Sequence, residues 1–155
     1  MILESGIIET KLFDATYGNE DTGRSVVSLF KEMGSPRAFL IEFLLADAWK
    51  ETYYRQKQTK GVDLIPHDVT KRSLEVKATN ASGGVDLQPS GGKGMNRTPK
   101  IDVFYTNCAT SDYVVVDSQY LKDTGDIRYV ILSGEFLLQN QKHKFTKKEV
   151  AKIFI

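Results

Sequence analysis

The sequence predicts a mixed α/β (α+β) domain in which helices flank a central mixed β-sheet. Two observations lead to this prediction. A long, almost wholly apolar helical segment lies in the first third of the chain, and several short strand-like runs separated by turn residues follow it. The 155 residues fall within the usual size of one domain. We therefore expect residues 1–155 to form a single domain.

Charge balance and cysteine content exclude several classes of protein. The 21 Lys and Arg against 20 Asp and Glu leave a net charge of +1, so any basic surface must be local. Cys108 is the only cysteine, which rules out an intramolecular disulfide and a cysteine-based zinc site. No apolar run reaches the roughly 20 residues of a membrane span, and no secretory signal is evident. We expect a cytoplasmic protein with no membrane partner.

The first third of the chain favours one strand and then helices. Residues 6–13 are strand-like, and residues 26–30 have helical spacing. Ser35 and Pro36 resemble an N-cap followed by proline at the first helical position. Residues 36–54 have the strongest helical pattern, and their apolar side chains lie on nearly every side. This helix is expected to be central and largely buried.

The rest of the chain favours strands. Strand-like runs occupy residues 60–65, 73–79, 101–107, 112–117 and 127–133. Thr146 and Glu149 have the spacing of a capping box, which predicts a short C-terminal helix. Residues 80–100 contain five glycines and two prolines, which predicts a long irregular loop. Loops of that length in compact domains are often functional.

Residues 61–80 place charged side chains inside strand-like runs. If the connection is centred on Val69, antiparallel pairing puts Asp63 opposite Glu75, and strand alternation puts Lys77 on the same face as Glu75. Facing residues have Cβ atoms roughly 4.5 to 5.5 Å apart. Two carboxylates that close repel each other, and a hard divalent cation between them would relieve the repulsion. The Lys77 ammonium would complete a site for an anion and a polarised water.

This arrangement resembles the PD-(D/E)xK nuclease superfamily, which includes many type II restriction enzymes, some homing endonucleases and Holliday-junction resolvases. The superfamily pattern is an Asp near the end of one strand, a turn, and Glu-x-Lys on the next strand. Asp63, Glu75 and Lys77 match it here, and the resemblance covers about residues 36–117. Val62 precedes Asp63 where the motif has a proline that is commonly absent in the superfamily.

The resemblance implies a restriction endonuclease-like fold and a single nuclease domain over residues 1–155. It implies an endonuclease that cuts double-stranded DNA at a specific sequence. In the implied mechanism, Asp63, Glu75 and the Val76 carbonyl hold Mg²⁺, for which Mn²⁺ is a possible substitute. Lys77 orients or helps deprotonate the attacking water, and the products carry 5′-phosphate and 3′-hydroxyl ends.

A bare acid-x-Lys triplet is a weak signal, and the chain contains a second one, Glu9-Thr-Lys11. Only Glu4 lies upstream of that triplet, so no strand pair can supply a partner acid. Residues 75–77 differ because they lie in an alternating strand, follow the apolar helix and have Asp63 at a distance that pairing can bridge. The alternative interpretation is a surface strand with an ordinary salt bridge between Glu75 and Lys77.

Glu42 lies in the middle of the apolar helix, where a carboxylate without a partner would be expensive. Several branches of the resembling superfamily use a helical Glu before the catalytic hairpin to bind metal, directly or through water. The alternative is a salt bridge with Arg37 or Arg55. Both interpretations of Glu42 stay open.

The glycine-rich loop is the expected place for DNA contacts. Lys93, Arg97 and Lys100 could reach phosphates, while Gln88 and Asn96 could address base edges. The alternative is a solvated loop without a ligand.

Cutting both strands of DNA suggests a homodimer or a higher homo-oligomer with twofold symmetry. His67 and His143 stand apart from each other, so a histidine-based nuclease is not expected. Restriction, homing and junction resolution all fit the pattern. A noncatalytic nucleic-acid-binding or protein-binding module is the alternative from another class.

Overall fold

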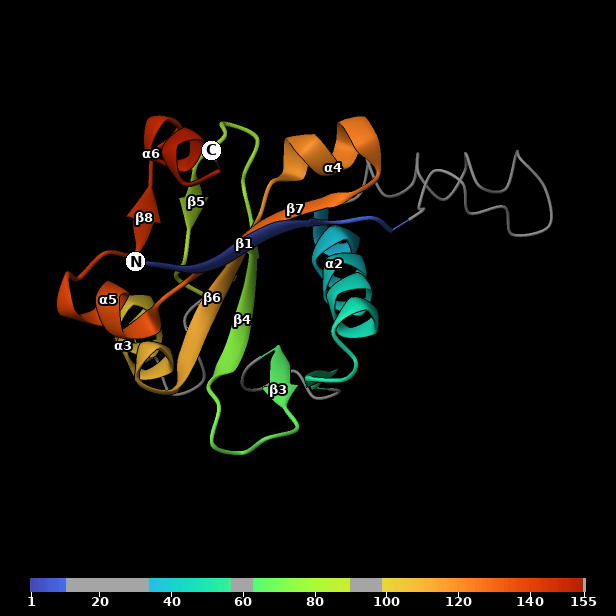
Figure 1. Cartoon of the computed structure of the whole chain (residues 1–155). Helices are drawn as coiled ribbons and strands as arrows, with labels where there is room; N and C mark the ends of the chain where they lie inside the picture. Colours follow the sequence, from blue (N-terminus) through green and yellow to red (C-terminus); the bar gives the residue numbers. More distant parts are fainter. Residues whose placement is uncertain (11–33, 57–62, 90–98, 155) are drawn as a thin grey trace.

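The structure is a computed structural model that describes residues 1–10, 34–56, 63–89 and 99–154. Its elements are, in chain order, β1 (Ile2–Ile8), α2 (Gly34–Ala48), β2 (Tyr53–Arg55), β3 (Leu64–Pro66), β4 (Ser73–Ala78), β5 (Val85–Asp86), α3 (Lys100–Thr110), β6 (Ser111–Val116), α4 (Ser118–Thr124), β7 (Ile127–Leu132), α5 (Gly134–Gln139), β8 (Lys144–Phe145) and α6 (Lys147–Ile153). The described residues thus form an α/β structure with five helices (Figure 1). None of these helices is both long and apolar enough to cross a membrane.

A six-stranded mixed sheet organises the molecule, in the strand order β1-β7-β6-β4-β3-β2. Strands β4 and β6 are parallel neighbours, and α3 lies between them in the chain. The other neighbouring pairs of this sheet are antiparallel. Strands β5 and β8 form a separate two-stranded sheet. The predicted central mixed sheet with flanking helices is confirmed.

Apolar side chains cover both faces of the sheet. On one face, α2 contributes Ile41 and Leu45 to a buried cluster with residues of β3, β4, β6 and β7. On the other face, α3 contributes Phe104 and Cys108 to a second cluster that also includes residues of α5 and α6. All residues of β6 are buried, as expected for a strand that is covered on both faces.

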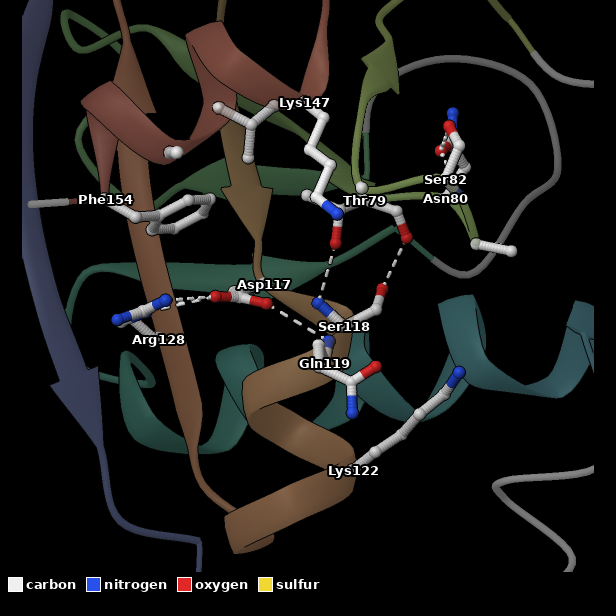
Figure 2. Close-up of a pocket in the computed structure, with 14 residues that line it drawn as sticks. Thr79, Asn80, Ser82, Asp117, Ser118, Gln119, Lys122, Arg128, Lys147 and Phe154 are labelled. Carbon is white, nitrogen blue, oxygen red and sulfur yellow. Dashed lines mark hydrogen bonds and ion pairs between the residues drawn. The ribbon is translucent and has the colours of Figure 1, made fainter.

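Polar contacts join the ends of the two parallel strands. Asp117 follows β6 directly, and its carboxylate accepts hydrogen bonds from backbone N–H groups in the first turn of α4 (Figure 2). The Ser118 N–H donates to Thr79 Oγ1 at 2.9 Å, and Ser118 Oγ donates to the Thr79 carbonyl at 2.6 Å. These bonds fix the start of α4 against the end of β4.

Several predicted elements are confirmed. The strands predicted at residues 73–79, 112–117 and 127–133 correspond to β4, β6 and β7 with bounds shifted by no more than one residue. The capping box of Thr146 and Glu149 opens α6 as predicted. Strand β1 begins earlier than the predicted residues 6–13. Residues 26–30, predicted to be helical, lie outside the described residues.

Other boundaries were predicted wrongly. Residues 101–107 form part of α3 and not a strand. Their β-branched and aromatic residues favour a strand. Phe104 and Cys108, however, lie one helical turn apart and are both buried, so burial of one helical face outweighs the strand propensity. Helix α2 begins at Gly34, so Ser35 is not its N-cap, and it ends at Ala48. The last residues of the predicted helix instead form the edge strand β2.

Candidate functional site

The hairpin between β3 and β4 brings the predicted acidic pair together. Leu64 pairs with Leu74 across the two antiparallel strands. Asp63 precedes Leu64 and Glu75 follows Leu74, so continuation of this register sets the two acids opposite each other. The register is therefore the one that the sequence predicts.

The two acids have different hydrogen-bonding surroundings. Asp63 Oδ2 accepts a hydrogen bond of 2.8 Å from the backbone N–H of Val76. The Glu75 side chain belongs to a residue that is only 7% exposed, and its Oε1 atom is buried with no hydrogen-bond partner among the described residues. A buried carboxylate oxygen without a donor is destabilising. This oxygen is therefore a candidate ligand atom for a cation.

Glu42, Asp63 and Glu75 influence one another electrostatically. Burial, followed by the negative charge of Asp63, raises the pKa of Glu75 from 4.5 to about 8, while the Lys77 ammonium acts in the opposite direction. Burial and then Asp63 also raise the pKa of Glu42 to about 6, opposed by Arg55. Like charges this close favour the uptake of a proton or a cation.

Glu42 combines features of both interpretations that the sequence left open. Its Oε2 atom lies 3.2 Å from Arg55 Nε, and both side chains are 16% exposed, so the predicted salt bridge with Arg55 is confirmed. The influence of Asp63 on its pKa places the same carboxyl group beside the acidic pair. A role in metal binding stays a prediction.

Lys77 lies two residues after Glu75 on β4, so strand alternation puts both on one face. Its Nζ atom donates to the Gln88 carbonyl at 3.2 Å. Gln88 Nε2 lies 3.0 Å from His143 Nδ1, which accepts this bond when that nitrogen is unprotonated. Gln88, predicted to bind DNA, thus links Lys77 to His143, which the sequence leaves isolated.

The remaining predicted DNA contacts are placed only in part. Lys100 is the first residue of α3 and is exposed. Lys93, Asn96 and Arg97 lie outside the described residues. The predicted irregular loop contains the short strand β5 before that gap.

The donor atoms of this cluster suit a hard divalent cation such as Mg²⁺ or Mn²⁺, because all of them are oxygens. The Glu75 oxygen without a partner fits such a ligand. Across the described ranges of the chain, however, no three His, Cys, Asp or Glu side chains are grouped so that they could hold a metal ion. Arg55 engages Glu42, and the N–H of Val76 engages Asp63. The donors that fit are therefore the predicted pair Asp63 and Glu75, and not three carboxylates.

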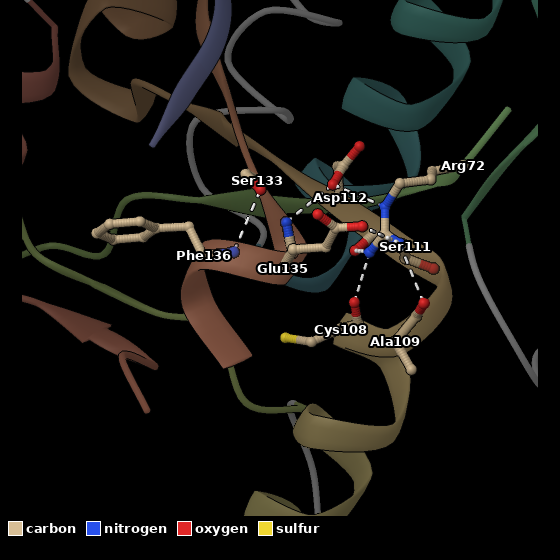
Figure 3. Close-up of polar contacts among 9 residues, drawn as sticks. Arg72, Cys108, Ala109, Ser111, Asp112, Ser133, Glu135 and Phe136 are labelled. Atoms are coloured by element: carbon tan, nitrogen blue, oxygen red, sulfur yellow. Dashed lines mark hydrogen bonds and ion pairs between the residues drawn. The ribbon is translucent and has the colours of Figure 1, made fainter. Parts of the chain in front are cut away.

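A second buried charged cluster was missed by the sequence analysis (Figure 3). Arg72 Nε donates to Asp112 Oδ1 at 3.0 Å, and its other nitrogens donate to three backbone carbonyls at the junction of α3 and β6. The N–H of Gly134 gives Asp112 a further hydrogen bond of 2.8 Å. This cluster is structural, because the Arg72 guanidinium and the Asp112 carboxylate both find their partners within it. No sequence signal connects Arg72 with Asp112, since they lie 40 positions apart.

Comparison of the chain with protein-family models, curated proteins and solved structures finds no match. The chemistry of the site therefore rests on its own residues. Asp63 and Glu75 supply carboxyl oxygens at one place, and Lys77 supplies an amino group on the same face of β4.

Proposed function

We propose that this protein is a metal-dependent endonuclease of double-stranded DNA with a restriction endonuclease-like fold. The observation that carries the proposal is the buried Glu75 oxygen without a donor, on a carboxylate opposite Asp63 and two residues before Lys77. The order of elements also supports it, because α2 precedes the strands that carry these residues and the parallel strand β6 follows them. This matches the extent of the resemblance to the PD-(D/E)xK nucleases.

In this proposal, Asp63, Glu75 and the Val76 carbonyl hold Mg²⁺, with Mn²⁺ as a substitute. Glu42 adds a further carboxylate, directly or through water. When bound, the cation supplies Lewis acidity toward a phosphate oxygen. Lys77 lies beside this place, and the hydrogen bond from its Nζ to the Gln88 carbonyl fixes where the ammonium lies.

The reaction is the addition of water across one phosphodiester bond. The water oxygen bonds to phosphorus in line with the P–O3′ bond, that bond breaks, and a proton passes to the departing 3′ oxygen. The products carry 5′-phosphate and 3′-hydroxyl ends. Lys77 orients the water and stabilises the negative charge that develops on the phosphate oxygens.

A plasmid-cleavage assay tests this function. The parent should cut in Mg²⁺ and not in EDTA, while Asp63→Asn, Glu75→Gln and Lys77→Ala should each lower the cleavage rate by about 10³-fold or more. Glu51→Gln is the matched control, because Glu51 is exposed in the turn after α2, and it should cut like the parent. Full cleavage by Asp63→Asn or Glu75→Gln would reject the proposed site.

The same assay separates the kinds of nuclease. Discrete fragments from long DNA indicate a sequence-specific restriction or homing enzyme, and the frequency of sites distinguishes these two. Cleavage confined to four-way junctions indicates a resolvase. If the protein binds DNA but shows no EDTA-sensitive cleavage, it is a noncatalytic module.

We further propose that two copies pair through β1 to act on both DNA strands. β1 is an edge strand of the sheet, and its Leu3 and Ile7 are 58% and 55% exposed. It contains no Pro or Lys, residues that commonly protect edge strands from pairing. Antiparallel self-pairing centred on Ser5 would set Leu3 of one copy opposite Ile7 of the other, as twofold symmetry requires.

Sedimentation velocity tests this homodimer. Ile7→Lys should shift the protein from dimer to monomer by placing like charges in the interface. Val69→Lys is the control, because Val69 is 92% exposed in the β3–β4 connection, and it should stay dimeric. A monomeric parent, or a dimer that Ile7→Lys leaves intact, would exclude pairing through β1.

A further inference from the structure

A second polar site lies beyond the end of β4. A cavity of about 580 Å³ is lined by the turn Asn80–Gly83 and by residues of α4 and α6 (Figure 2). It lies where the parallel strands β4 and β6 end, because Thr79 and Asp117, the residues that follow them, both line it. In open α/β sheets, ligands bind in crevices outside the carboxyl ends of strands. The volume is also within the roughly 300 to 1,000 Å³ of ligand pockets.

The cavity carries more positive than negative charge. Its charged lining residues are Lys122, Arg128 and Lys147 against the single acid Asp117. Asp117 and Arg128 form an ion pair, so their charges compensate each other. Among the described residues, neither Lys122 nor Lys147 has an acidic partner. Two ammonium groups without a counter-charge favour an anionic ligand.

The backbone is shaped around one of these lysines. Gly83 has a φ of 89°, which favours glycine. A Cβ at this position would lie 3.0 Å from Lys147 Cγ, so the missing side chain leaves room for the stem of Lys147. Figure 2 shows Lys147 extending from α6 toward Thr79. The turn itself is held by Asn80 Oδ1, which accepts from the Ser82 N–H at 3.0 Å.

The cavity adjoins the proposed catalytic strand. Thr79 lines it and lies two residues after Lys77. At about 3.3 Å per residue, this separation is about 7 Å along the strand direction. That distance equals the axial rise of about two nucleotides of one DNA strand, at roughly 3.4 Å each. A nucleic-acid strand that runs along β4 with one phosphate at Lys77 would therefore bring another phosphate to the cavity.

We infer that this cavity binds a backbone phosphate that flanks the position of cleavage, with Lys122 and Lys147 as its cationic partners. The inference rests on the proposed function, because it takes nucleic acid as the ligand. Asn80, Ser82 and Gln119 add polar groups to the lining. Contacts of this kind position a nucleic acid without reading its sequence.

Binding of a fluorescein-labelled 20-base-pair duplex in EDTA, measured by anisotropy at several salt concentrations, tests the inference without any cleavage. The variant Lys122→Ala/Lys147→Ala should lower the slope of log affinity against log salt by about 0.9, because one phosphate loses its cationic partners. Lys144→Ala/Lys148→Ala is the matched control, because both residues are exposed and lie outside the cavity lining. The control should keep the parental slope, and Lys122→Gln/Lys147→Gln should repeat the loss if the alanine pair folds poorly.

The outcomes separate this inference from the proposed function. A parental slope in both cavity variants overturns the inference, even if the parent cleaves DNA in Mg²⁺. If the parent never cleaves DNA but the cavity variants have a reduced slope, the phosphate site is supported and only the nuclease function is rejected. Thermal stabilisation by AMP that the cavity variants abolish, together with a parental DNA slope, overturns the inference in favour of a free nucleotide.

Discussion

Two buried carboxylates on neighbouring strands have opposite surroundings. Glu75 on β4 and Asp112 on β6 belong to residues that are each 7% exposed, and their strands are paired. Asp112 receives hydrogen bonds from Arg72 at 3.0 Å and from the Gly134 N–H at 2.8 Å (Figure 3). Glu75 has an oxygen without a donor and faces Asp63, a second acid.

The partners of Asp112 offset the cost of burying its charge, whereas burial of Glu75 beside Asp63 destabilises the folded state. A buried charge with a cation and good hydrogen bonds is tolerated, whereas removal of either partner is strongly destabilising. A buried acid beside another acid destabilises the folded state until a proton or a cation neutralises it. Burial alone therefore does not indicate function. Nor does a missing partner alone, because the buried hydroxyls of Ser111 and Tyr113 also lack partners among the described residues. The informative observation is a carboxyl oxygen without a donor that faces a second acid.

The largest effect on stability is expected in the satisfied cluster. Arg72→Met should lower the free energy of unfolding by about 2–4 kcal/mol, because the Asp112 charge stays buried without its cation. Urea unfolding measures this change. Glu135→Gln is the control, because Glu135 lies 3.9 Å from Arg72 but its side chain is 73% exposed, and it should change stability by less than about 0.5 kcal/mol. A loss below about 1 kcal/mol for Arg72→Met would contradict the structural role.

The next effect concerns cation binding. At a Ca²⁺ concentration of about 100 times the Kd, the parent should gain about 2.7 kcal/mol of stability by mass action. Glu75→Gln should lose this gain because it removes a ligand. Asp112→Asn should lower stability in EDTA but keep the Ca²⁺-dependent gain. Melting curves with and without Ca²⁺ check both variants, and equal gains in all three proteins would show that Glu75 binds no cation.

A somewhat smaller effect concerns pH in the absence of metal. Glu75 has a pKa of about 8 in the folded protein against 4.5 as its ordinary value, so the folded state binds more protons between these values. The parent should therefore lose stability as pH rises from about 5 to 8. Glu75→Gln does not titrate, so at pH 8 it should exceed the parent by about 1–3 kcal/mol.

Urea unfolding in EDTA at pH 5 and pH 8 measures this difference. Glu51→Gln, at an exposed position, should follow the parent. A parental pH dependence in Glu75→Gln would mean that this carboxyl group is not the one whose pKa is raised by burial and by Asp63.

The register of the β3–β4 hairpin was predictable because it depends on residues close together in the sequence. Strand alternation and a short connection are enough to set Asp63 opposite Glu75, and the pairing of Leu64 with Leu74 has that register. The same alternation predicts that Lys77 shares the face of Glu75. Burial of the second half of β6 likewise follows from its run of three valines, Val114 to Val116. Burial of the polar Ser111 and Asp112 at its start does not follow from that run.

Features that depend on packing between distant elements were not predictable. Residues 101–107 have strand-like composition, yet burial of Phe104 and Cys108 on one helical face outweighs it. The Arg72–Asp112 pair joins residues that only the adjacent strands β4 and β6 bring together. The link from Lys77 through Gln88 to His143 depends in the same way on how β8 packs near β5.

The smallest expected effect concerns Glu42, which pairs with Arg55 and is also a proposed metal ligand. Glu42 pairs with Arg55 at 3.2 Å, and its charge also contributes to the raised pKa of Glu75. If it belongs to the metal shell, Glu42→Gln should raise the Mg²⁺ concentration for half-maximal cleavage several-fold, because the site loses one negative charge. Its stability in EDTA should change by only about 1 kcal/mol, since the lost ion pair is offset by weaker repulsion among the acids.

Asp47→Asn, at an exposed acid of the same helix, should keep the parental Mg²⁺ requirement. A titration of cleavage with Mg²⁺ at pH 8 compares the three proteins. If Glu42→Gln loses stability while its Mg²⁺ requirement is unchanged, the carboxylate serves only to hold Arg55, and the proposed metal site consists of Asp63, Glu75 and the Val76 carbonyl alone.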